Sequence, residues 1–555
     1  MIKNLIVLLV TIFGFHFTFS QSLNWSWAKN PHGNDSDYGS SVTADVSGNV
    51  YAVGTFSGPS ISFGAYTLIN NGGTAMYLTK YNSTGDIIWA RTFGGTNNNP
   101  WSVTTDNAGN IYMGGTFSGT LTADGVTLNS DGPVSDIFLL KLDGSGNTLW
   151  GRSATGKGVD NLWSVKTDGS GNVYLTGDFH SNILQFGSVK VTGGISNGKM
   201  YLAKYSSDGE ILWAITSEGS NNSAAYSVTT DASGNVFITG GFASPAITFG
   251  NDVLKNKGGS NVFVAKYDGN GNALWGRAGT GGGFENSNVV ITDAANNIYI
   301  TGSFPADGIR FDNTQLSSAG RTDIFIAKYS NSGNLLWAKS AGGDRTDIAF
   351  SLSAGANNNI YVAGYYKSAS ILFGSATLNN ALAASPDIFI AEYDSEGNAI
   401  TAVGAGGTDD DQAYAITSDA NGNIYATGFF FSTDISCGST TLNNSGPDGS
   451  SDVFIAKLNS SLSEASMYSK NIERPIPEEN AITIYPNPAT DLFMIKLSRS
   501  ALAHFEVYDV SGKKILEKNI NSMQTIVGCK DLVPGIYLVR VIDGKNWFSK
   551  KIVVQ

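Results

Sequence analysis

One motif recurs seven times along the chain and constrains the fold more than any other feature. Its copies read Asp-x-x-Gly-Asn-Val-Tyr or a close variant, with successive spacings of 61, 62, 63, 62, 62 and 64 residues. They open at Asp45, Asp106, Asp168, Asp231, Asp293, Gly355 and Asp419. A glycine follows the Tyr or Phe of every copy by three positions. A fixed period in this range indicates a solenoid, a propeller or an array.

Each copy reads as four short strands. In the fifth copy the apolar segments are residues 289–292, 298–301, 324–329 and 334–338, joined in pairs by turns rich in Asn, Ser and Gly. These turn residues tolerate positive φ and are typical of hairpins. Both faces of the strands are apolar, as expected for sheets packed between two neighbours. Four strands repeated radially predict a β-propeller.

The phase of the repeat predicts how the ring closes. The chain opens with a segment like a fourth strand, residues 23–28 with Trp27, whereas the last copy ends after its third strand, residues 453–458. We therefore expect the N-terminal strand to complete the seventh blade, which protects the sheet edges. The prediction is an all-β, seven-bladed propeller over residues 21–465.

The repeat resembles a known family of bacterial propellers. The run from Gly406 to Gly428 has the form Gly-Gly-x-x-x-Asp-x-Ala-Tyr-x-Ile-x-x-Asp-x-x-Gly-Asn-Ile-Tyr-x-x-Gly. It is similar to the SBBP repeat of seven-bladed propellers. This resemblance implies a fold and says little about activity.

The N-terminus reads as a secretory signal peptide at residues 1–20, cut between Ser20 and Gln21. A lysine precedes an apolar stretch, and polar sequence follows it. The alternative is a membrane anchor, but Thr11 and Gly14 interrupt an apolar run that is short for a span. No other run approaches membrane length, so we expect no transmembrane segment in the mature protein.

The C-terminal region changes character after a polar linker at residues 466–478. Short alternating strands separated by Pro, Asn and Gly predict a small β-sandwich at residues 479–555. Four motifs follow in order: Tyr-Pro-Asn-Pro from 485, Tyr-Asp-Val-Ser-Gly-Lys from 508, Pro-Gly-Ile-Tyr from 534 and Lys-Lys-Ile-Val-Val from 550. Together they resemble the type A C-terminal sorting domain of the type IX secretion system.

That resemblance implies export to the periplasm, recognition of the tail by the type IX machinery, removal of the tail, and release or surface attachment. The residues that carry it are Pro486, Asn487, Pro488, Asp509, Gly512, Lys513, Gly535, Lys550 and Lys551. The alternative is an ordinary accessory β-sandwich.

One position between the fourth strand of a copy and the first strand of the next is acidic in five of seven copies. If the first strand is innermost, these residues ring one mouth of the central channel. The connection between second and third strands emerges on the same face, which we therefore expect to hold long, variable loops. The ring comprises Asp37, Asn98, Asp160, Ser223, Glu285, Asp347 and Asp411.

Two interpretations of this ring stay open. A carboxylate-lined mouth suits a cation, a sugar or a basic peptide, whereas each Asp or Asn can instead accept hydrogen bonds from its own turn. The run Asp409-Asp410-Asp411 departs from the other copies and is the place we select for a bound cation such as calcium. The recurrent Trp of the fourth strand and Lys of the third strand are interpreted as inter-blade packing and structure.

The composition disfavours several kinds of chemistry. A formal charge of −12 gives no electrostatic drive toward nucleic acid. Once both ends are removed, His32 and His180 are the remaining histidines, and neither lies near a nucleophile motif or a metal-spaced partner. Cys437 reads as a buried apolar residue. We expect no cofactor and assign no catalytic residue or metal site.

The first functional hypothesis is a secreted or surface-displayed, monomeric, non-catalytic module that binds an extracellular glycan or protein. The second is a carbohydrate-active or other hydrolytic enzyme that uses acidic residues at the mouth. The third is a structural or adhesive module whose role is display.

Overall fold

A computed structural model describes residues 20–95, 97–194, 198–219, 222–355, 358–463, 482–497, 503–509, 513–520, 524–530, 532–543 and 546–555. Residues 1–19 of the predicted signal peptide and the predicted linker lie outside this range. The chain divides into two compact parts, Met1–Ala465 and Ser466–Gln555. All regular elements of the described residues are strands, and they include no helix suited to crossing a membrane.

The described residues of the N-terminal part contain seven antiparallel sheets built on one four-strand plan, numbered here in chain order. Sheet 1 consists of β3 (Asp37–Ala44), β4 (Val50–Phe56), β7 (Ala75–Tyr81) and β8 (Ile87–Thr92), and sheet 2 of β9 (Asn99–Thr105), β10 (Ile111–Phe117), β13 (Asp136–Leu142) and β14 (Thr148–Thr155). Sheet 3 consists of β15 (Asp160–Thr167), β16 (Val173–Phe179), β19 (Lys199–Tyr205) and β20 (Ile211–Thr216). Sheet 4 consists of β22 (Ser223–Thr230), β23 (Val236–Phe242), β26 (Asn261–Tyr267) and β27 (Ala273–Gly281). Sheet 5 consists of β28 (Asn286–Thr292), β29 (Ile298–Pro305), β32 (Thr322–Tyr329) and β33 (Leu335–Ala341). Sheet 6 consists of β34 (Asp347–Ala354), β35 (Ile360–Tyr366), β38 (Asp387–Tyr393) and β39 (Ala399–Ala405). Sheet 7 consists of β40 (Asp411–Ser418), β41 (Asn423–Phe430), β44 (Asp452–Ser463) and β1 (Ser20–Lys29).

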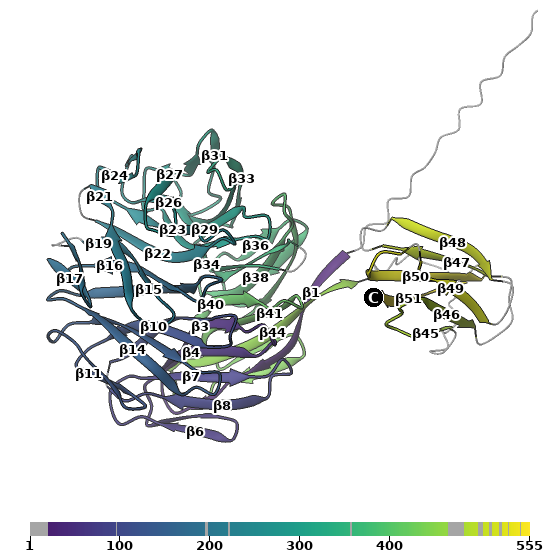
Figure 1. The fold of residues 1–555 in the computed structure, drawn as a ribbon, viewed down its shortest axis with the longest axis horizontal. Coiled ribbons are helices and arrows are strands. Elements are labelled where there is room, and N and C mark those ends of the chain that lie inside the picture. The colour runs from purple at the N-terminus through teal and green to yellow at the C-terminus, as the bar shows by residue number, and fades with distance from the viewer. Residues whose placement is uncertain are drawn as a thin grey trace, which may run out of the picture. The chain divides into compact units, whose positions relative to one another are not determined.

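The first strands of these sheets form the inner wall of a closed ring. Each first strand contacts the first strand of the next sheet, from β3 through β40, and β40 contacts β3 again. In Figure 1 the labels of first strands lie around the middle of the ring, whereas fourth strands lie toward its rim. The architecture is propeller-like, as the repeat predicts.

The N-terminal strand closes this ring. β1 pairs antiparallel with β44, from Ser20 opposite Ser463 to Lys29 opposite Ile455. Residues 459–463, which stand where the last copy should supply a fourth strand, instead lengthen its third strand. The predicted closure of the last sheet by the first strand is confirmed.

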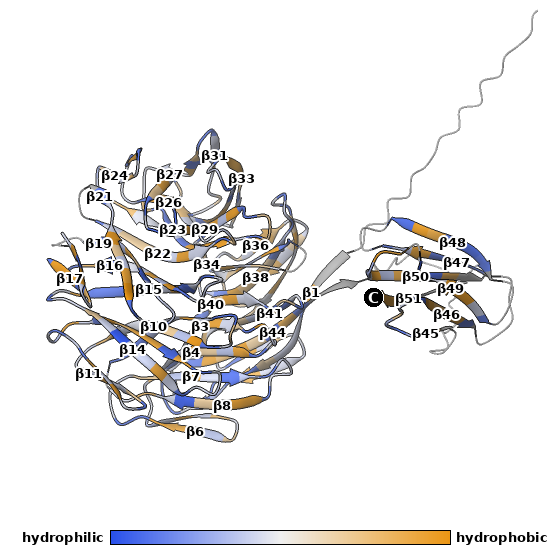
Figure 2. Ribbon diagram, viewed as in Figure 1, coloured by the Kyte–Doolittle hydropathy of each residue, from blue (hydrophilic) through white to orange (hydrophobic). Residues whose placement is uncertain are grey.

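The apolar core lies between sheets. Seven clusters of buried side chains each combine residues of two neighbouring sheets, and one of them joins Tyr425 and Ile455 of sheet 7 to Val50 and Tyr77 of sheet 1. Figure 2 accordingly shows apolar residues spread along the strands around the ring. Strands buried on both faces explain why the sequence reads as apolar runs more than as strict alternation.

The repeated motif builds the hairpin between first and second strands. In sheet 1, Asp45 Oδ1 accepts hydrogen bonds from the backbone N–H of Ser47 and Asn49, each at 2.9 Å. Gly48 has φ +79°, a conformation that glycine adopts without strain. Two copies place Asn296 or Asn358 there instead, with φ of 60° and 59°. The turn chemistry expected from the sequence is therefore present.

The connections between second and third strands differ from the expected long loops, because each folds into a β-hairpin. The Ile-x-Phe-Gly segment supplies the first strand and the turn of the hairpin. The sequence did not predict these hairpins, because strands of three or four residues are too short to show a clear alternation of apolar and polar residues. Short strands β2 (His32–Gly33) and β21 (Glu218–Gly219) pair with two of the hairpins. The hairpins are β5 (Ser60–Phe63) with β6 (Tyr66–Ile69), β11 (Thr120–Ala123) with β12 (Val126–Asn129), β17 (Ile183–Phe186) with β18 (Val189–Thr192), β24 (Ala246–Phe249) with β25 (Asp252–Lys255), β30 (Ile309–Phe311) with β31 (Thr314–Leu316), β36 (Ser370–Phe373) with β37 (Ala376–Asn379), and β42 (Asp434–Cys437) with β43 (Thr440–Asn443).

The C-terminal part is a small β domain with two sheets around one core. Phe493, Phe505, Val539 and Ile552 are buried together in that core. The sheets are β45 (Ile482–Tyr485), β46 (Leu492–Leu497) and β49 (Gln524–Gly528); and β48 (Lys514–Ile520), β47 (Ala503–Tyr508), β50 (Gly535–Asp543) and β51 (Asn546–Val554).

Candidate functional site

The acidic ring expected at an open mouth is buried. Six of its members have no exposed surface, and Ser223 is 5 % exposed. The six are Asp37, Asn98, Asp160, Glu285, Asp347 and Asp411. The expectation that these side chains face an open channel is therefore corrected, because the neighbouring sheet and its hairpin cover them.

In three sheets the buried carboxylate holds the connection together. Asp411 accepts hydrogen bonds from Ser432 Oγ at 2.7 Å and Gly407 N at 2.8 Å. Asp347 makes the same contacts with Ser368 and Gly343, and Asp160 bonds Ser181. These bonds are those of the structural interpretation, in which the acid fixes the geometry of its connection.

A second set of carboxyl groups, which the sequence analysis did not identify, lies beside the first. These residues sit at the start of the third strands: Asp136, Asp323, Asp387 and Asp452, with Asn261 in sheet 4. The backbone N–H of Asp411 donates to Pro386 O at 2.8 Å, so Asp411 lies next to Asp387 of the preceding sheet. Burial raises the pKa of Asp411 to about 7 and that of Asp387 to about 6. The recurrent Asp-Ile-Phe or Asp-Val-Phe was the sequence signal for this set.

Asp409 and Asp410 remain exposed while Asp411 turns inward. Asp409 N donates to Ser432 Oγ at 3.0 Å, and Asp410 Oδ1 accepts a hydrogen bond from Ser385 Oγ at 3.3 Å. The three carboxylates therefore do not converge on one point, and their role as a cation site stays a prediction. Among the described residues, the group with metal-binding spacing is instead His504, Glu506 and Glu517 of the C-terminal part, where Lys514 already pairs with both glutamates.

Aromatic side chains occupy a register position on the first strands, three residues after the acidic one. The position is aromatic in five of seven sheets, and its side chains are half-buried: Trp101, Trp163, Tyr226, Phe350 and Tyr414, with Ser40 and Asn288 in the other two. Ring centroids are 5.2 Å apart for Trp101 and Trp163 and 6.1 Å for Trp163 and Tyr226. Phe350 and Tyr414 stack at 4.7 Å. The inner wall therefore carries two aromatic arcs, and the 62-residue period was the signal that could have revealed them.

Polar groups border the first arc at sheet 3. Trp163 Nε1 donates to Asp178 Oδ1 at 2.6 Å, and Asn161 Nδ2 donates to Asp178 Oδ2 at 3.2 Å. His180 Nε2 lies 3.2 Å from Asp178 Oδ2, and the histidine side chain is 37 % exposed. The adjacent hydroxyl of Ser181 is buried and donates to Asp160. This arrangement offers flat apolar faces beside hydrogen-bonding groups, and Ser181 is not available as a nucleophile.

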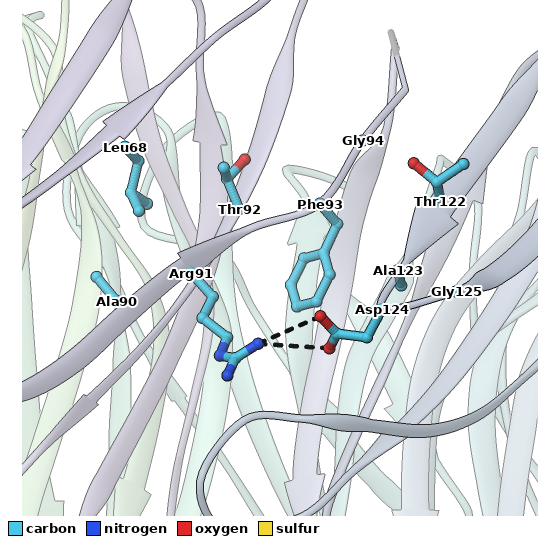
Figure 3. Close-up of a pocket in the computed structure, with 10 residues that line it drawn as sticks. All are labelled: Leu68, Ala90, Arg91, Thr92, Phe93, Gly94, Thr122, Ala123, Asp124 and Gly125. Atoms are coloured by element: carbon cyan, nitrogen blue, oxygen red, sulfur yellow. Dashed lines mark hydrogen bonds and ion pairs between the residues drawn. The ribbon is translucent and has the colours of Figure 1, made fainter.

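Two pockets lie on the outer side of the ring. One, of about 440 Å³, is lined by β8 and the β11–β12 hairpin, where Arg91 pairs with Asp124 at 3.4 Å (Figure 3). The second, of about 430 Å³, has Arg277 paired with Asp252 at 2.9 Å. Both form beside a fourth strand, between the hairpin of its own sheet and the hairpin of the next, so they follow from the repeat.

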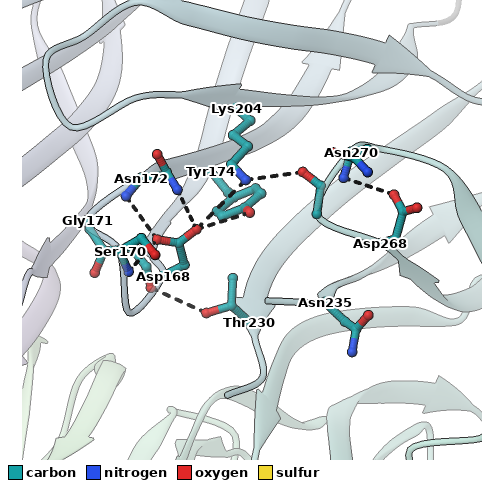
Figure 4. A network of polar contacts seen from close by, with 12 residues as sticks. Asp168, Ser170, Gly171, Asn172, Tyr174, Lys204, Thr230, Asn235, Asp268 and Asn270 are labelled. Carbon is teal, nitrogen blue, oxygen red and sulfur yellow. Dashed lines mark hydrogen bonds and ion pairs between the residues drawn. The ribbon is translucent and has the colours of Figure 1, made fainter. Parts of the chain in front are cut away.

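Members of the Lys and Trp series attach their own sheet to the next one, although Trp89 Nε1 has no hydrogen-bond partner and sheet 6 has Glu392 and Thr401 at these positions. Lys204 Nζ and Trp213 Nε1 both donate to Gly269 O of sheet 4, at 3.1 and 3.3 Å. Figure 4 shows Lys204 beside Asp168 and Tyr174, with the lysine 4.9 Å from the Tyr174 ring centroid. At the ring closure, Trp27 and Lys457 donate to Ser83 O. The structural interpretation of both series is confirmed, as is burial of Cys437, which is 1 % exposed.

Two motif residues of the C-terminal part, Asn487 and Asp509, hydrogen-bond through their side chains to backbone groups. Asn487, between Pro486 and Pro488, donates from Nδ2 to Lys551 O at 2.9 Å and accepts from Val553 N at 2.8 Å. Asp509 Oδ1 accepts from Lys513 N at 3.0 Å. The side chains of Lys550 and Lys551 are exposed, and Gly535 begins β50. Gly512 lies outside the described residues.

Comparison with known proteins finds two sequence relatives and distant structural neighbours. The uncharacterized WD repeat-containing protein L264 of Acanthamoeba polyphaga mimivirus is 25% identical over 367 residues, 52% of this chain and 26% of that protein. The regulatory protein FlaEY of Caulobacter vibrioides is 29% identical over 110 residues, 20% of this chain and 12% of that protein. The chain thus spans about a quarter or less of these relatives.

Solved structures that align along most of the chain include a fungal alcohol oxidase of the AA5 family in complex with copper, with TM-score 0.39, 12% identity, and coverage of 96% of this chain and 99% of that one. Another is PorZ, a surface component of the type IX secretion system of Porphyromonas gingivalis, with TM-score 0.20, 9% identity, and coverage of 95% and 100%.

The C-terminal part has a direct family match. Residues 483–555 match the family described as a secretion system C-terminal sorting domain. The chain therefore carries a type IX secretion system C-terminal sorting domain, through which it is secreted or attached at the outer surface.

Proposed function

We propose that the mature protein is a seven-bladed, SBBP-type propeller, residues 21–465, which binds an extracellular glycan and is not an enzyme. In this proposal a linker at 466–478 joins the propeller to a sorting domain at 479–555. The observation that carries the binding role is the arc of Trp101, Trp163 and Tyr226 on the innermost strands. Half-exposed indole and phenol faces stack on the apolar faces of sugar rings, and polar groups at their edges fix hydroxyls.

The polar border of the arc supports a glycan over an apolar ligand. Asp178 is bonded to Trp163 and Asn161, and His180 adds a partly exposed ring nitrogen. Such groups both donate and accept hydrogen bonds, as sugar hydroxyls require. The second arc, Phe350 with Tyr414, has no comparable set of side-chain hydrogen bonds within the described part of the chain, so the proposal assigns the ligand to the Trp arc.

A glycan array probed with the secreted protein tests this proposal. Trp163→Ala is expected to weaken binding of any glycan found at least about fivefold, since stacking on one aromatic ring contributes about 1 kcal/mol or more. Trp213→Phe is the matched control, because Trp213 lies on an outer strand and bonds Gly269. Equal binding by the wild type and Trp163→Ala, with Trp213→Phe also unchanged, would exclude the arc as the site.

The alternative is hydrolysis of the bound glycan, which the contact between His180 and Asp178 favours. A His–carboxylate pair is a common general acid–base arrangement. Product release measured by chromatography, and abolished by His180→Ala with retained binding, would replace the binding function with an enzymatic one.

A further inference from the structure

The junction that closes the ring contains two adjacent buried carboxyl groups. Asp37 begins the first strand of sheet 1, and Asp452 begins the third strand of sheet 7. The backbone N–H of Asp37 donates to Ser451 O at 2.8 Å, and Ser451 Oγ donates to Asp37 O at 3.1 Å. Neither aspartate has exposed surface. The junction therefore brings two carboxylates together inside the protein.

Three of the four oxygens in this pair have no hydrogen-bond partner. They are both carboxylate oxygens of Asp37 and Oδ1 of Asp452. The fourth, Asp452 Oδ2, accepts from Ser445 N at 2.8 Å and Ser445 Oγ at 2.9 Å. A buried carboxylate without a partner is costly, because it has lost water and gained nothing in exchange.

The other sheets show what is missing here. The residue two positions after the second strand is Ser181, Ser368 or Ser432 in sheets 3, 6 and 7, and its hydroxyl donates to the equivalent aspartate at 2.7 Å. In sheet 1 that position is Gly58. A serine hydroxyl therefore donates to the aspartate at three junctions, whereas Gly58 offers no hydroxyl to Asp37 at the closing junction.

The charges around Asp37 do not offset its burial. Burial, together with repulsion from Asp452 and Asp35, raises the pKa of Asp37 to about 8. Burial raises the pKa of Asp452 as well, opposed in part by hydrogen bonds from Ser445 and Asn30 and by the charge of His32. A cation in contact with the three unpartnered oxygens would neutralise the pair.

We propose that Asp37 and Asp452 bind a divalent cation of the calcium type, which joins the first sheet to the last. Carboxylate oxygens are the ligands of hard cations, and Ca²⁺ accepts six to eight oxygens in flexible geometry, including carbonyls and waters. The site is independent of the glycan proposal. It locks the one junction whose two sheets come from opposite ends of the propeller sequence.

Calcium titration of the full chain, after treatment with EDTA and at pH 7.5, tests the site. Calorimetry is expected to show one site with Kd about 10⁻⁴ M, typical of extracellular calcium modules, and the thermal midpoint is expected to rise with Ca²⁺. Asp37→Asn with Asp452→Asn is expected to lose calcium binding by at least about 100-fold. The matched control is Asp136→Asn with Asp160→Asn, a junction whose carboxylates already have partners.

A second variant keeps the test independent of folding defects. Gly58→Ser supplies the hydroxyl found at the other junctions, so we expect it to raise the thermal midpoint in EDTA and to reduce the effect of Ca²⁺. The proposal is overturned if the wild type shows neither calcium heat nor a midpoint shift at pH 7.5, or if the control pair loses calcium binding as fully as Asp37→Asn with Asp452→Asn.

Discussion

Two positions of the repeat differ in the sixth sheet. Gly355 replaces the aspartate of the turn, and Glu392 replaces the lysine of the third strand. In sheet 7, Asp419 accepts hydrogen bonds from Asn423 and Tyr425, and the third-strand lysine lies nearby. In sheet 6, Glu392 Oε1 accepts from Asn359 Nδ2 at 2.8 Å and Tyr361 OH at 2.9 Å. The carboxylate thus comes from the third strand in sheet 6 and from the turn in sheet 7. In both sheets it accepts hydrogen bonds from the Asn and the Tyr of the motif.

This exchange predicts that Glu392→Lys destabilises sheet 6. The variant buries a lysine in place of the carboxylate that Asn359 and Tyr361 contact, at a position with no exposed surface. The expected loss is about 3 kcal/mol in the free energy of unfolding. Adding Gly355→Asp restores the arrangement of the other sheets and is expected to recover part of that loss. Urea denaturation of both variants measures this coupling. Equal stability of Glu392→Lys and wild type would contradict the compensation.

The buried carboxyl pairs at the other junctions predict a pH dependence of stability. Burial raises the pKa values of Asp323 and Asp387 to about 6 and of Asp411 to about 7, above the ordinary value of 3.8. Between pH 4 and 7 the folded state therefore binds more protons than the unfolded state, so stability falls as pH rises through this range.

Urea denaturation in EDTA at pH 5 and pH 7.5 measures that slope. Asp387→Asn keeps an acceptor for Ala381 N and removes one raised pKa, so a smaller loss of stability on going to pH 7.5 is expected. Asp268→Asn, in an exposed turn, is the control. An identical slope in wild type and Asp387→Asn would remove these pairs as its cause.

At the scale of the element, the sequence predicted what depends on local chemistry. Turns need residues that adopt positive φ, and four-strand units need apolar runs, so both could be read from Asp-x-x-Gly-Asn and its neighbours. The hairpin after the second strand was taken for a loop, because its strands are short. The depth of the acidic position could not be predicted either. The repeat register assigns Asp411 to the ring, but it does not tell that the hairpin and the preceding sheet bury Asp411 while Asp410 stays exposed.

The aromatic arcs were missed for a related reason. Trp163 of the inner strand and Trp150 of the outer strand are the same residue type at different registers. Only the order of strands from the centre to the rim tells which one faces the channel and which one bonds the next sheet.

The attachment of each third strand to the next sheet carries its own prediction. Lys328 donates to Ser395 O at 2.9 Å and lies 4.9 Å from the Tyr299 ring centroid. Lys328→Met removes both contacts and is expected to lower the free energy of unfolding by about 1 to 2 kcal/mol. Lys339→Met, on the exposed face of β33, is the control and is expected to be neutral. A neutral Lys328→Met would show that packing alone joins the sheets.

At the scale of the whole molecule, stability depends on closure. Every core cluster of the ring lies between two sheets, so opening one junction removes a full cluster's partner and exposes two sheet faces. The number of sheets and the phase offset that requires closure were visible in the sequence, since both follow from counting a repeat. The unsatisfied carboxylates at the closing junction were not, because burial and missing partners belong to the assembled ring.

This dependence predicts that removing residues 21–29 opens the ring of sheets. The deletion takes away the pairing partner of β44, the buried side chains of Leu23 and Ala28, and the bond from Trp27 to Ser83. Burial of Leu23 and Ala28 alone contributes roughly 2 to 4 kcal/mol, and loss of the pairing with β44 adds to this. The unpaired edge of β44 is also expected to promote association of chains.

Thermal unfolding and size-exclusion chromatography measure the two effects. Removing only Gln21 and Ser22, which precede the buried Leu23, is the control. An unchanged midpoint in the longer deletion would mean that β1 covers the ring without closing it.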